Sequence, residues 1–169
     1  LHTCDDIIIG GAMAFSFIKY LNGFIGISLY EAEQIKNVSN ILNLAKKHNC
    51  NIHLPVDVVS LKRNTKLTYK RNIYKIPDDE MGLDIGPKSC VRFKSIILKS
   101  KTIIWNGPMG MFEKKEFKDG TEQVLLAISS ATQSGSYSLV GGGDTLSAIS
   151  NFKKTNSNFP NFNFMSSGG

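Results

Sequence analysis

Short apolar runs along this chain alternate with segments whose apolar residues recur every three or four positions. The runs predict β-strands at 5–9, 51–59, 101–105, 136–140 and 161–165. The periodic segments predict helices at 13–21, 29–48, 87–101, 120–132 and 145–152, the fourth with core positions at Val124, Leu125, Ile128 and Ala131. Strands that are separated by helices favour a parallel sheet covered on both faces, with right-handed crossovers. We therefore predict an α/β fold with three αβα layers.

Residues 60–84 break this alternation, because they are polar and weakly periodic. Within them, 66–70 and 72–76 alternate in the manner of exposed hairpin strands, so we predict a β-hairpin insertion at the edge of the sheet. Residues 1–169 are expected to form a single domain. That domain is expected to be incomplete, since the sequence opens on Leu1 and closes inside a glycine-containing loop.

The composition narrows the classes of function. Cys4, Cys50 and Cys90 are widely spaced and form no metal-ligand pair, which indicates a reducing compartment and ordinary buried thiols. The net charge of +6 comes almost wholly from lysine, which fits either a solvated surface or a field that attracts anions such as nucleotides. The aromatic residues form no RNA-binding strand motif, and no apolar run reaches the ~20 residues that span a bilayer. We expect no nucleic-acid or membrane partner.

The first candidate site is a glycine turn, Gly141, Gly142 and Gly143, followed by Asp144 and Thr145. It follows a predicted strand and opens a predicted helix. Successive glycines let several backbone N–H groups converge on one anion, and the helix adds its positive end. Asp144 fits either a helix N-cap or a ligand of the magnesium ion that accompanies nucleotide phosphates. The pattern is not a P-loop, because no Lys-Ser/Thr pair follows the glycines.

The second candidate site is the segment 105–113, which reads Trp-Asn-Gly-Pro-Met-Gly-Met-Phe-Glu and also follows a predicted strand. Met109 and Met111 could form an apolar surface for a nucleoside base, and Glu113 could accept hydrogen bonds from ribose hydroxyls. The same residues equally fit core filler and a solvated charge near a helix start.

Five segments occur in one order: 7–15, 54–59, 81–87, 105–113 and 141–145. Taken together, they closely resemble the nucleotide-binding, C-terminal half of phosphoglycerate kinase over nearly the whole chain. The resemblance implies a Rossmann-like nucleotide-binding domain that uses ATP or ADP with Mg²⁺. It also implies a glycolytic kinase, which reversibly transfers a phosphoryl group between 1,3-bisphosphoglycerate and ADP to give 3-phosphoglycerate and ATP.

The resemblance assigns a role to each matching position. It implies an adenine pocket at Gly10, Gly11, Gly82, Leu83, Pro108 and Met111. It implies that Asn106 lies beside the nucleotide and that Glu113 binds the ribose. It implies that Gly141, Gly142, Gly143 and Thr145 hold phosphates, that Asp144 holds the metal, and that Gly143, Gly168 and Gly169 stabilise charge in the transition state.

Several features of the family are missing from this sequence, among them the upstream lysine strand and the half that holds 3-phosphoglycerate. We therefore expect these residues alone to be inactive and at best to bind nucleotide weakly. We also expect a monomer, located in the cytoplasm or, alternatively, in a plastid or other organelle. Two other classes stay open: a non-catalytic nucleotide-binding or interaction module, and a nicotinamide-dependent oxidoreductase, which only the α/β pattern suggests. His2, His48 and His53 share no spacing with acids and receive no catalytic role.

Overall fold

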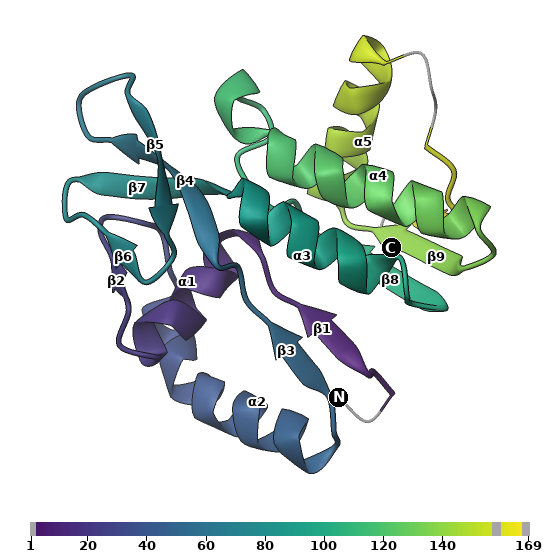
Figure 1. The fold of residues 1–169 in the computed structure, drawn as a ribbon, viewed down its shortest axis with the longest axis horizontal. Helices are drawn as coiled ribbons and strands as arrows, with labels where there is room; N and C mark the ends of the chain where they lie inside the picture. The colour runs from purple at the N-terminus through teal and green to yellow at the C-terminus, as the bar shows by residue number, and fades with distance from the viewer. Residues whose placement is uncertain (1–2, 157–159, 167–169) are drawn as a thin grey trace. The chain divides into compact units, whose positions relative to one another are not determined.

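The structure is a computed structural model that describes residues 3–156 and 160–166. The chain divides into two compact units, Leu1–Ser89 and Cys90–Gly169, and Figure 1 labels most of their helices and strands. Both contain parallel strands connected through helices, so the predicted α/β class is confirmed.

The first unit contains short paired strands and two α-helices. Its helices are α1 (Gly11–Tyr20), the 3-10 helix η1 (Ala32–Gln34) and α2 (Ile35–Lys47). Its strands are β1 (Asp6–Ile8), β2 (Phe24–Ile25), β3 (Asn51–His53), β4 (Asp57–Lys62), β5 (Thr68–Asn72), β6 (Lys75–Ile76) and β7 (Glu80–Ile85). Strand β1 pairs with β3 and β2 pairs with β6, both in parallel, while β5, β4 and β7 form an antiparallel sheet in that order.

Helix α1 lies between two apolar clusters of the first unit. Phe15 and Ile18 belong to a cluster with residues of β4 and β6, and Ala14 and Phe17 belong to a second cluster with Val38 of α2. A helix that is apolar on several sides is buried on several sides. This explains why residues 14–18 are all buried in a helix of ten residues.

Three predictions about the elements of the first unit were wrong. The helix predicted at 29–48 begins at Ile35, after η1. The strand predicted at 51–59 is two strands, because Pro55 lacks the N–H that a central strand donates to its neighbour. The hairpin is formed by β4 and β5, whereas 66–70 and 72–76 were expected to pair with each other.

A buried carboxylate links the three strands of this antiparallel sheet. The side chain of Glu80 is 2% exposed and accepts hydrogen bonds from Arg71, at 2.9 Å from Nε and 2.5 Å from Nη2. The hydroxyl of Ser60 also donates to Glu80, and the Arg71 guanidinium lies 4.4 Å from the centre of the Tyr69 ring. A buried carboxylate is tolerated only when its oxygens are paired in this way. The Arg71 hydrogen bonds hold the pKa of Glu80 below its ordinary value.

We predict that Glu80→Gln lowers the free energy of unfolding at neutral pH, and that the difference from wild type shrinks in acid. A carboxyl whose pKa is depressed by folding stabilises the protein above its unfolded pKa and loses that effect as the pH falls through its folded pKa. Urea unfolding at several pH values from 7 to 3 measures the difference. Asp79→Asn is the control, since Asp79 forms an exposed pair with Lys62 and should change stability by less than about 1 kcal/mol. A difference that stays constant with pH would contradict the prediction.

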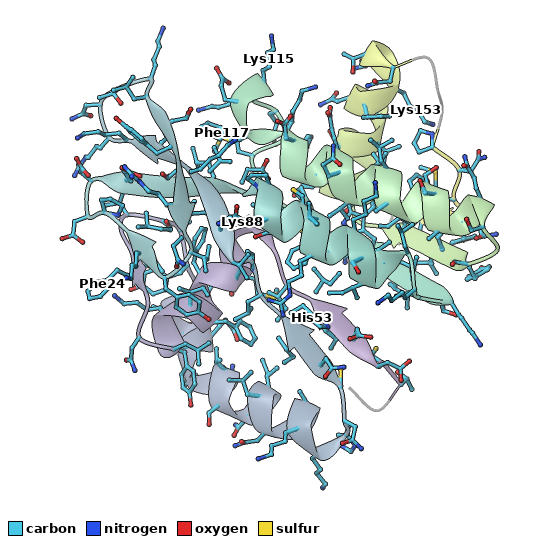
Figure 2. All side chains as sticks on the ribbon, viewed as in Figure 1. Phe24, His53, Lys88, Lys115, Phe117 and Lys153 are labelled. Carbon is cyan, nitrogen blue, oxygen red and sulfur yellow. The ribbon has the colours of Figure 1, made fainter. Side chains whose placement is uncertain are left out.

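Another carboxylate of the first unit fixes the start of helix α3 (Pro87–Ile97), within which the division between the units falls. Asp57 of β4 accepts hydrogen bonds from the N–H of Lys88 at 3.0 Å, and from the N–H and hydroxyl of Ser89 at 2.8 and 2.6 Å. Figure 2 labels Lys88 at this end of α3. A side chain on Gly86 would place its Cβ 2.3–2.7 Å from the Asp57 carboxylate, so the capping contact requires glycine there.

The second unit contains one parallel sheet. Its strands are β8 (Thr102–Asn106), β9 (Tyr137–Gly141) and β10 (Phe164–Ser166), in the order β10-β9-β8. Besides residues 90–97 of α3, the other described elements are the 3-10 helix η2 (Lys115–Phe117), α4 (Asp119–Gln133) and α5 (Gly143–Thr155). The predicted helices and strands of this unit are confirmed within a few residues. The predicted core positions of α4 are also confirmed, since Val124, Leu125, Ile128 and Ala131 are buried.

Candidate functional site

The parallel sheet of the second unit brings the two candidate segments together at its carboxyl edge. Asn106, the last residue of β8, pairs in register with Gly141, the last residue of β9. Gly141 pairs in turn with Ser166 of β10. Because all three strands run in parallel, the turns that follow them leave the sheet at the same edge. Ligands of α/β proteins bind at such edges.

Direct contacts join the two turns. The backbone N–H of Gly107 donates a 2.7 Å hydrogen bond to Oγ1 of Thr145. The side-chain oxygen of Asn106 lies against Gly142, where an added Cβ would come within 2.3 Å of it. Gly142 also has a φ of +90°, a conformation that other residues adopt only under strain. A glycine at this position is therefore required for two separate reasons.

Helix α5 begins inside the glycine turn without a side-chain cap. Its N-cap residue is Gly142, and among residues 3–156 and 160–166 no side chain forms a capping hydrogen bond. An added Cβ on Gly143 would meet no described residue within 4 Å. Unpaired N–H groups and the positive end of the helix dipole favour an anion at this position.

The placement of Asp144 decides against one of the two roles that the sequence left open, that of helix N-cap. Asp144 lies in the first turn of α5, exposed to solvent, and Gly142 occupies the N-cap position instead. Among residues 3–156 and 160–166, no group of three or more His, Cys, Asp and Glu side chains could hold a metal ion. One carboxylate together with nucleotide phosphates is nevertheless an ordinary arrangement for Mg²⁺, which keeps several of its waters. The residues present fit a magnesium ion that arrives with a nucleotide.

The turn after β8 is fixed by two side-chain hydrogen bonds that no sequence pattern indicates. The indole N–H of Trp105 donates to the carbonyl of Gly107 at 2.8 Å, and the N–H of Met109 donates to Oγ1 of Thr121 at 3.0 Å. Thr121 lies in the first turn of α4, twelve residues further on. A threonine near a helix start carries no sequence signal for such a contact, so only the folded chain reveals it.

The apolar residues of this turn differ in exposure. Met109 is 7% exposed and belongs to the core, so it fits the interpretation as a core residue better than that as a surface for a nucleoside base. Pro108 and Met111 are half-buried, and Glu113 is exposed. These three residues remain accessible to a ligand.

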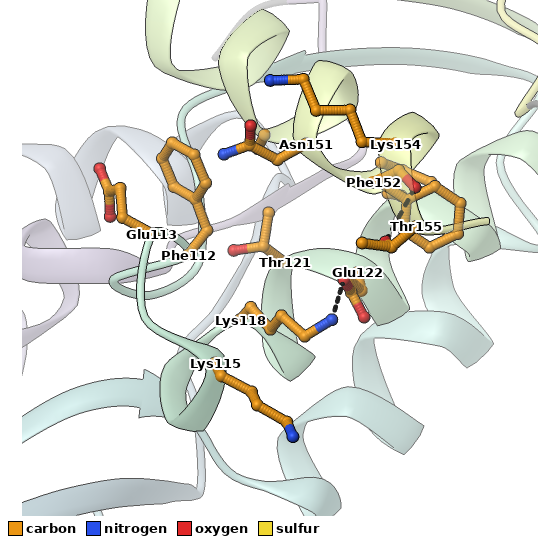
Figure 3. Close-up of a pocket in the computed structure, with 12 residues that line it drawn as sticks. Phe112, Glu113, Lys115, Lys118, Thr121, Glu122, Asn151, Phe152, Lys154 and Thr155 are labelled. Atoms are coloured by element: carbon orange, nitrogen blue, oxygen red, sulfur yellow. Dashed lines mark hydrogen bonds and ion pairs between the residues drawn. The ribbon is translucent and has the colours of Figure 1, made fainter.

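A hollow of about 430 Å³ lies beside Glu113, between η2, α4 and α5 (Figure 3). Its lining includes Phe112, Phe152 and the lysines at 115, 118 and 154. An ion pair joins Lys118 Nζ to Glu122 Oε1 at 2.7 Å within it, shown by a dashed line. The hollow combines apolar walls with positive charge, and it shares Glu113 with the candidate site.

The candidate residues of the first unit have a different setting. Gly10 is the N-cap residue of α1 and Gly11 is its first residue, and no side chain of the described residues caps this helix. Gly82, by contrast, lies inside strand β7 and is buried. An added Cβ on Gly82 would lie 2.4 Å from the Phe15 ring, so close packing of α1 already requires glycine here. Leu83, the next residue of β7, is half-buried.

Three other sequence-based expectations concern the last two glycines, the cysteines and the histidines. Gly168 and Gly169 lie outside the described residues. Cys50 is buried as expected, but Cys90 is only half-buried and Cys4 is exposed, so the expectation of buried thiols was wrong for Cys4. His53, labelled in Figure 2, has an acidic neighbour after all: its Nε2 lies 2.7 Å from Asp6 Oδ1, and this hydrogen bond lowers the pKa of Asp6.

Within the part of the chain that the structure describes, no helix is both long and apolar enough to cross a bilayer. The features above define a class: an α/β protein with an uncapped glycine turn and a neighbouring apolar turn at the carboxyl edge of a parallel sheet. That class includes many nucleotide-binding proteins.

The comparisons with known proteins are more specific. The family model described as phosphoglycerate kinase matches residues 1–169. The phosphoglycerate kinase of Euplotes crassus is 40% identical over 173 residues, which cover 100% of this chain and 41% of that protein. The one from Thermosipho africanus is 41% identical over 155 residues, which cover 90% and 39%. The chain belongs to the phosphoglycerate kinase family.

Solved structures agree with this assignment. The phosphoglycerate kinase structure from Coxiella burnetii matches with a TM-score of 0.86 and 32% identity, over 98% of this chain and 42% of that one. The structure from Pyrococcus horikoshii, at 23% identity and a TM-score of 0.78, covers 98% and 40% and shows the same fold. The 169 residues thus span about two fifths of the length of these relatives.

Proposed function

We propose that this chain binds a magnesium nucleotide, ADP or ATP, at the carboxyl edge of the β8–β9–β10 sheet. The observation that carries the proposal is the 2.7 Å hydrogen bond between Gly107 and Thr145, which ties an apolar turn to an uncapped helix N-terminus. One turn offers accessible apolar and carboxylate side chains for adenosine. The other offers backbone N–H groups for phosphates.

Each residue of the site would contact a different part of the nucleotide. Met111 and Pro108 would contact the base, and Glu113 would accept hydrogen bonds from the ribose. The N–H groups around Gly143 would hold phosphate oxygens, and Asp144 would hold the metal ion. Mg²⁺, when bound, neutralises part of the negative charge on the phosphates. The family resemblance also implies adenine contacts in the first unit, at Gly10, Gly11, Gly82 and Leu83.

We further propose that the site serves reversible phosphoryl transfer between 1,3-bisphosphoglycerate and ADP. In phosphoryl transfer, a protein contributes mainly by positioning the reactants and neutralising the charge of the phosphates, and less by covalent chemistry. Backbone N–H donors and a helix N-terminus supply both. The family resemblance assigns 3-phosphoglycerate binding to a half of the family's chain that these residues do not match, so turnover would require that half. The proposed single nucleotide-binding domain, monomeric state and cytoplasmic or organellar location also rest on the resemblance.

We predict that Asp144→Asn weakens the binding of Mg-ADP by about 10- to 100-fold and leaves the binding of metal-free ADP within about twofold, because it removes one ligand charge from the metal. Calorimetric titration of ADP with Mg²⁺ and with EDTA measures both. Asp119→Asn is the matched control, since Asp119 is an exposed aspartate in the first turn of α4. It should change neither affinity.

Two outcomes would contradict the proposal. The first is an ADP affinity of the wild-type chain that does not respond to Mg²⁺. The second is a preference for a nicotinamide dinucleotide over ADP, which would favour the oxidoreductase class instead.

A further inference from the structure

The side chain of Thr145 is turned away from any ligand of the glycine turn. Thr145 is 0% exposed, although it lies in the first turn of α5 beside exposed Gly143 and Asp144. Its Oγ1 accepts the 2.7 Å hydrogen bond from the N–H of Gly107. A hydroxyl that is buried and engaged in this way cannot also contact a phosphate. Only the backbone N–H of Thr145 remains for that role.

The hydroxyl of Thr145 is part of an interlock between the two turns. A Cβ built on Gly142 would lie 2.3 Å from Oδ1 of Asn106 and 3.5 Å from Oγ1 of Thr145. The Asn106 side chain and the Thr145 hydroxyl therefore approach Gly142 together. The indole of Trp105 also restrains the turn after β8, because it donates to the Gly107 carbonyl at 2.8 Å. Gly107 is thus held through both its N–H and its carbonyl.

We propose that Thr145 is a positioning residue, whose hydroxyl sets the separation between the turn that binds adenosine, 105–113, and the turn that binds phosphates, 141–145. This inference rests on the proposed function. A ligand that spans both turns benefits from a fixed separation, because its second half then binds at a high effective concentration. A ligand that occupies one turn gains nothing from it. Loss of the Thr145 hydroxyl should therefore weaken the binding of ADP, but not the binding of adenosine or of pyrophosphate alone.

The experiment compares Thr145→Val, which keeps the shape and removes the acceptor, with Thr145→Ser, which keeps the hydroxyl. Each is titrated with Mg-ADP, with adenosine and with Mg-pyrophosphate. We expect the valine variant to bind Mg-ADP about tenfold more weakly while its affinity for adenosine and for pyrophosphate changes less than about twofold. The serine variant should stay within about threefold of wild type for all three ligands. Equal losses for all three ligands would indicate a merely structural role and overturn the inference, and so would an unchanged Mg-ADP affinity.

A second measurement does not depend on nucleotide binding. Hydrogen exchange of the Gly107 amide should speed up about 10- to 100-fold in the valine variant and little in the serine variant, because only the former leaves that N–H without an acceptor. If the valine variant does not fold, the pair Thr145→Ala and Thr145→Ser makes the same comparison at similar volume.

The two measurements separate the two possible failures. A wild-type chain that binds no Mg-ADP contradicts the proposed function by itself, and with it the positioning role. Unchanged Gly107 exchange in the valine variant overturns the positioning role even where the wild type binds Mg-ADP normally, in which case the proposed function survives.

Discussion

Asp57→Ala is expected to lower the free energy of unfolding by about 3 kcal/mol. The Asp57 carboxylate is buried and accepts three hydrogen bonds, from the N–H of Lys88 and from the N–H and hydroxyl of Ser89. Alanine would leave these donors at the start of α3 without their acceptor and would remove a negative charge from the positive end of the helix. Unpaired buried donors cost about 1–3 kcal/mol each, and partial access of water reduces the sum. Urea unfolding monitored by circular dichroism measures the loss.

Two further variants test this explanation. Asp57→Asn keeps one acceptor oxygen and should fall between alanine and wild type. Asp78→Ala removes an exposed aspartate and should change stability by less than about 0.5 kcal/mol. If Asp57→Ala were as mild as Asp78→Ala, the carboxylate would not be holding α3 as described.

Gly142→Ala is expected to weaken the binding of Mg-ADP by about 100-fold. Alanine at a φ of +90° is strained, and its Cβ would lie 2.3 Å from the side-chain oxygen of Asn106. Relief of either strain must move the glycine turn or the Asn106 turn, and both turns contribute to the proposed site. Backbone N–H donors bind an anion only when their directions converge. Isothermal titration calorimetry with Mg-ADP measures the change.

Gly135→Ala is the matched control for the backbone strain. Gly135 has a φ of +101°, but an added Cβ there would meet nothing within 4 Å. It precedes β9, at the opposite end of the strand from Gly142. The control should lose roughly 1 kcal/mol of stability and keep its affinity for Mg-ADP. Equal affinity losses in the two variants would show that Gly142 affects stability alone.

The order of helices and strands was predictable because each longer element carries its own periodicity. Helix α4 is an example, since its four predicted core positions are all buried. Features that depend on pairing between distant segments were not predictable in the same way. Strand β2 has two residues and pairs with β6, so neither its length nor its composition marks it. The interruption after β3 could have been predicted from Pro55 alone, which lacks a backbone donor.

The candidate site was predictable where the chemistry belongs to the backbone. A run of glycines before a helix predicts an anion-binding turn, and the structure shows an uncapped helix start there. The roles of single side chains were harder to predict, because burial decides them. Met109 could have faced a ligand but is buried, and the hydroxyl of Thr145 is buried against Gly107. Gly82 has a packing role against Phe15 that no local pattern reveals.

Amide chemical shifts of the ¹⁵N-labelled chain, followed while Mg-ADP is added, test most directly whether the edge of the β8–β9–β10 sheet binds nucleotide. The account predicts saturable changes that are largest at the amides of Gly107 and residues 141–145, with Gly135 unaffected. Saturable changes confined to other residues, such as those lining the hollow in Figure 3, would contradict it. So would the absence of any change at millimolar Mg-ADP.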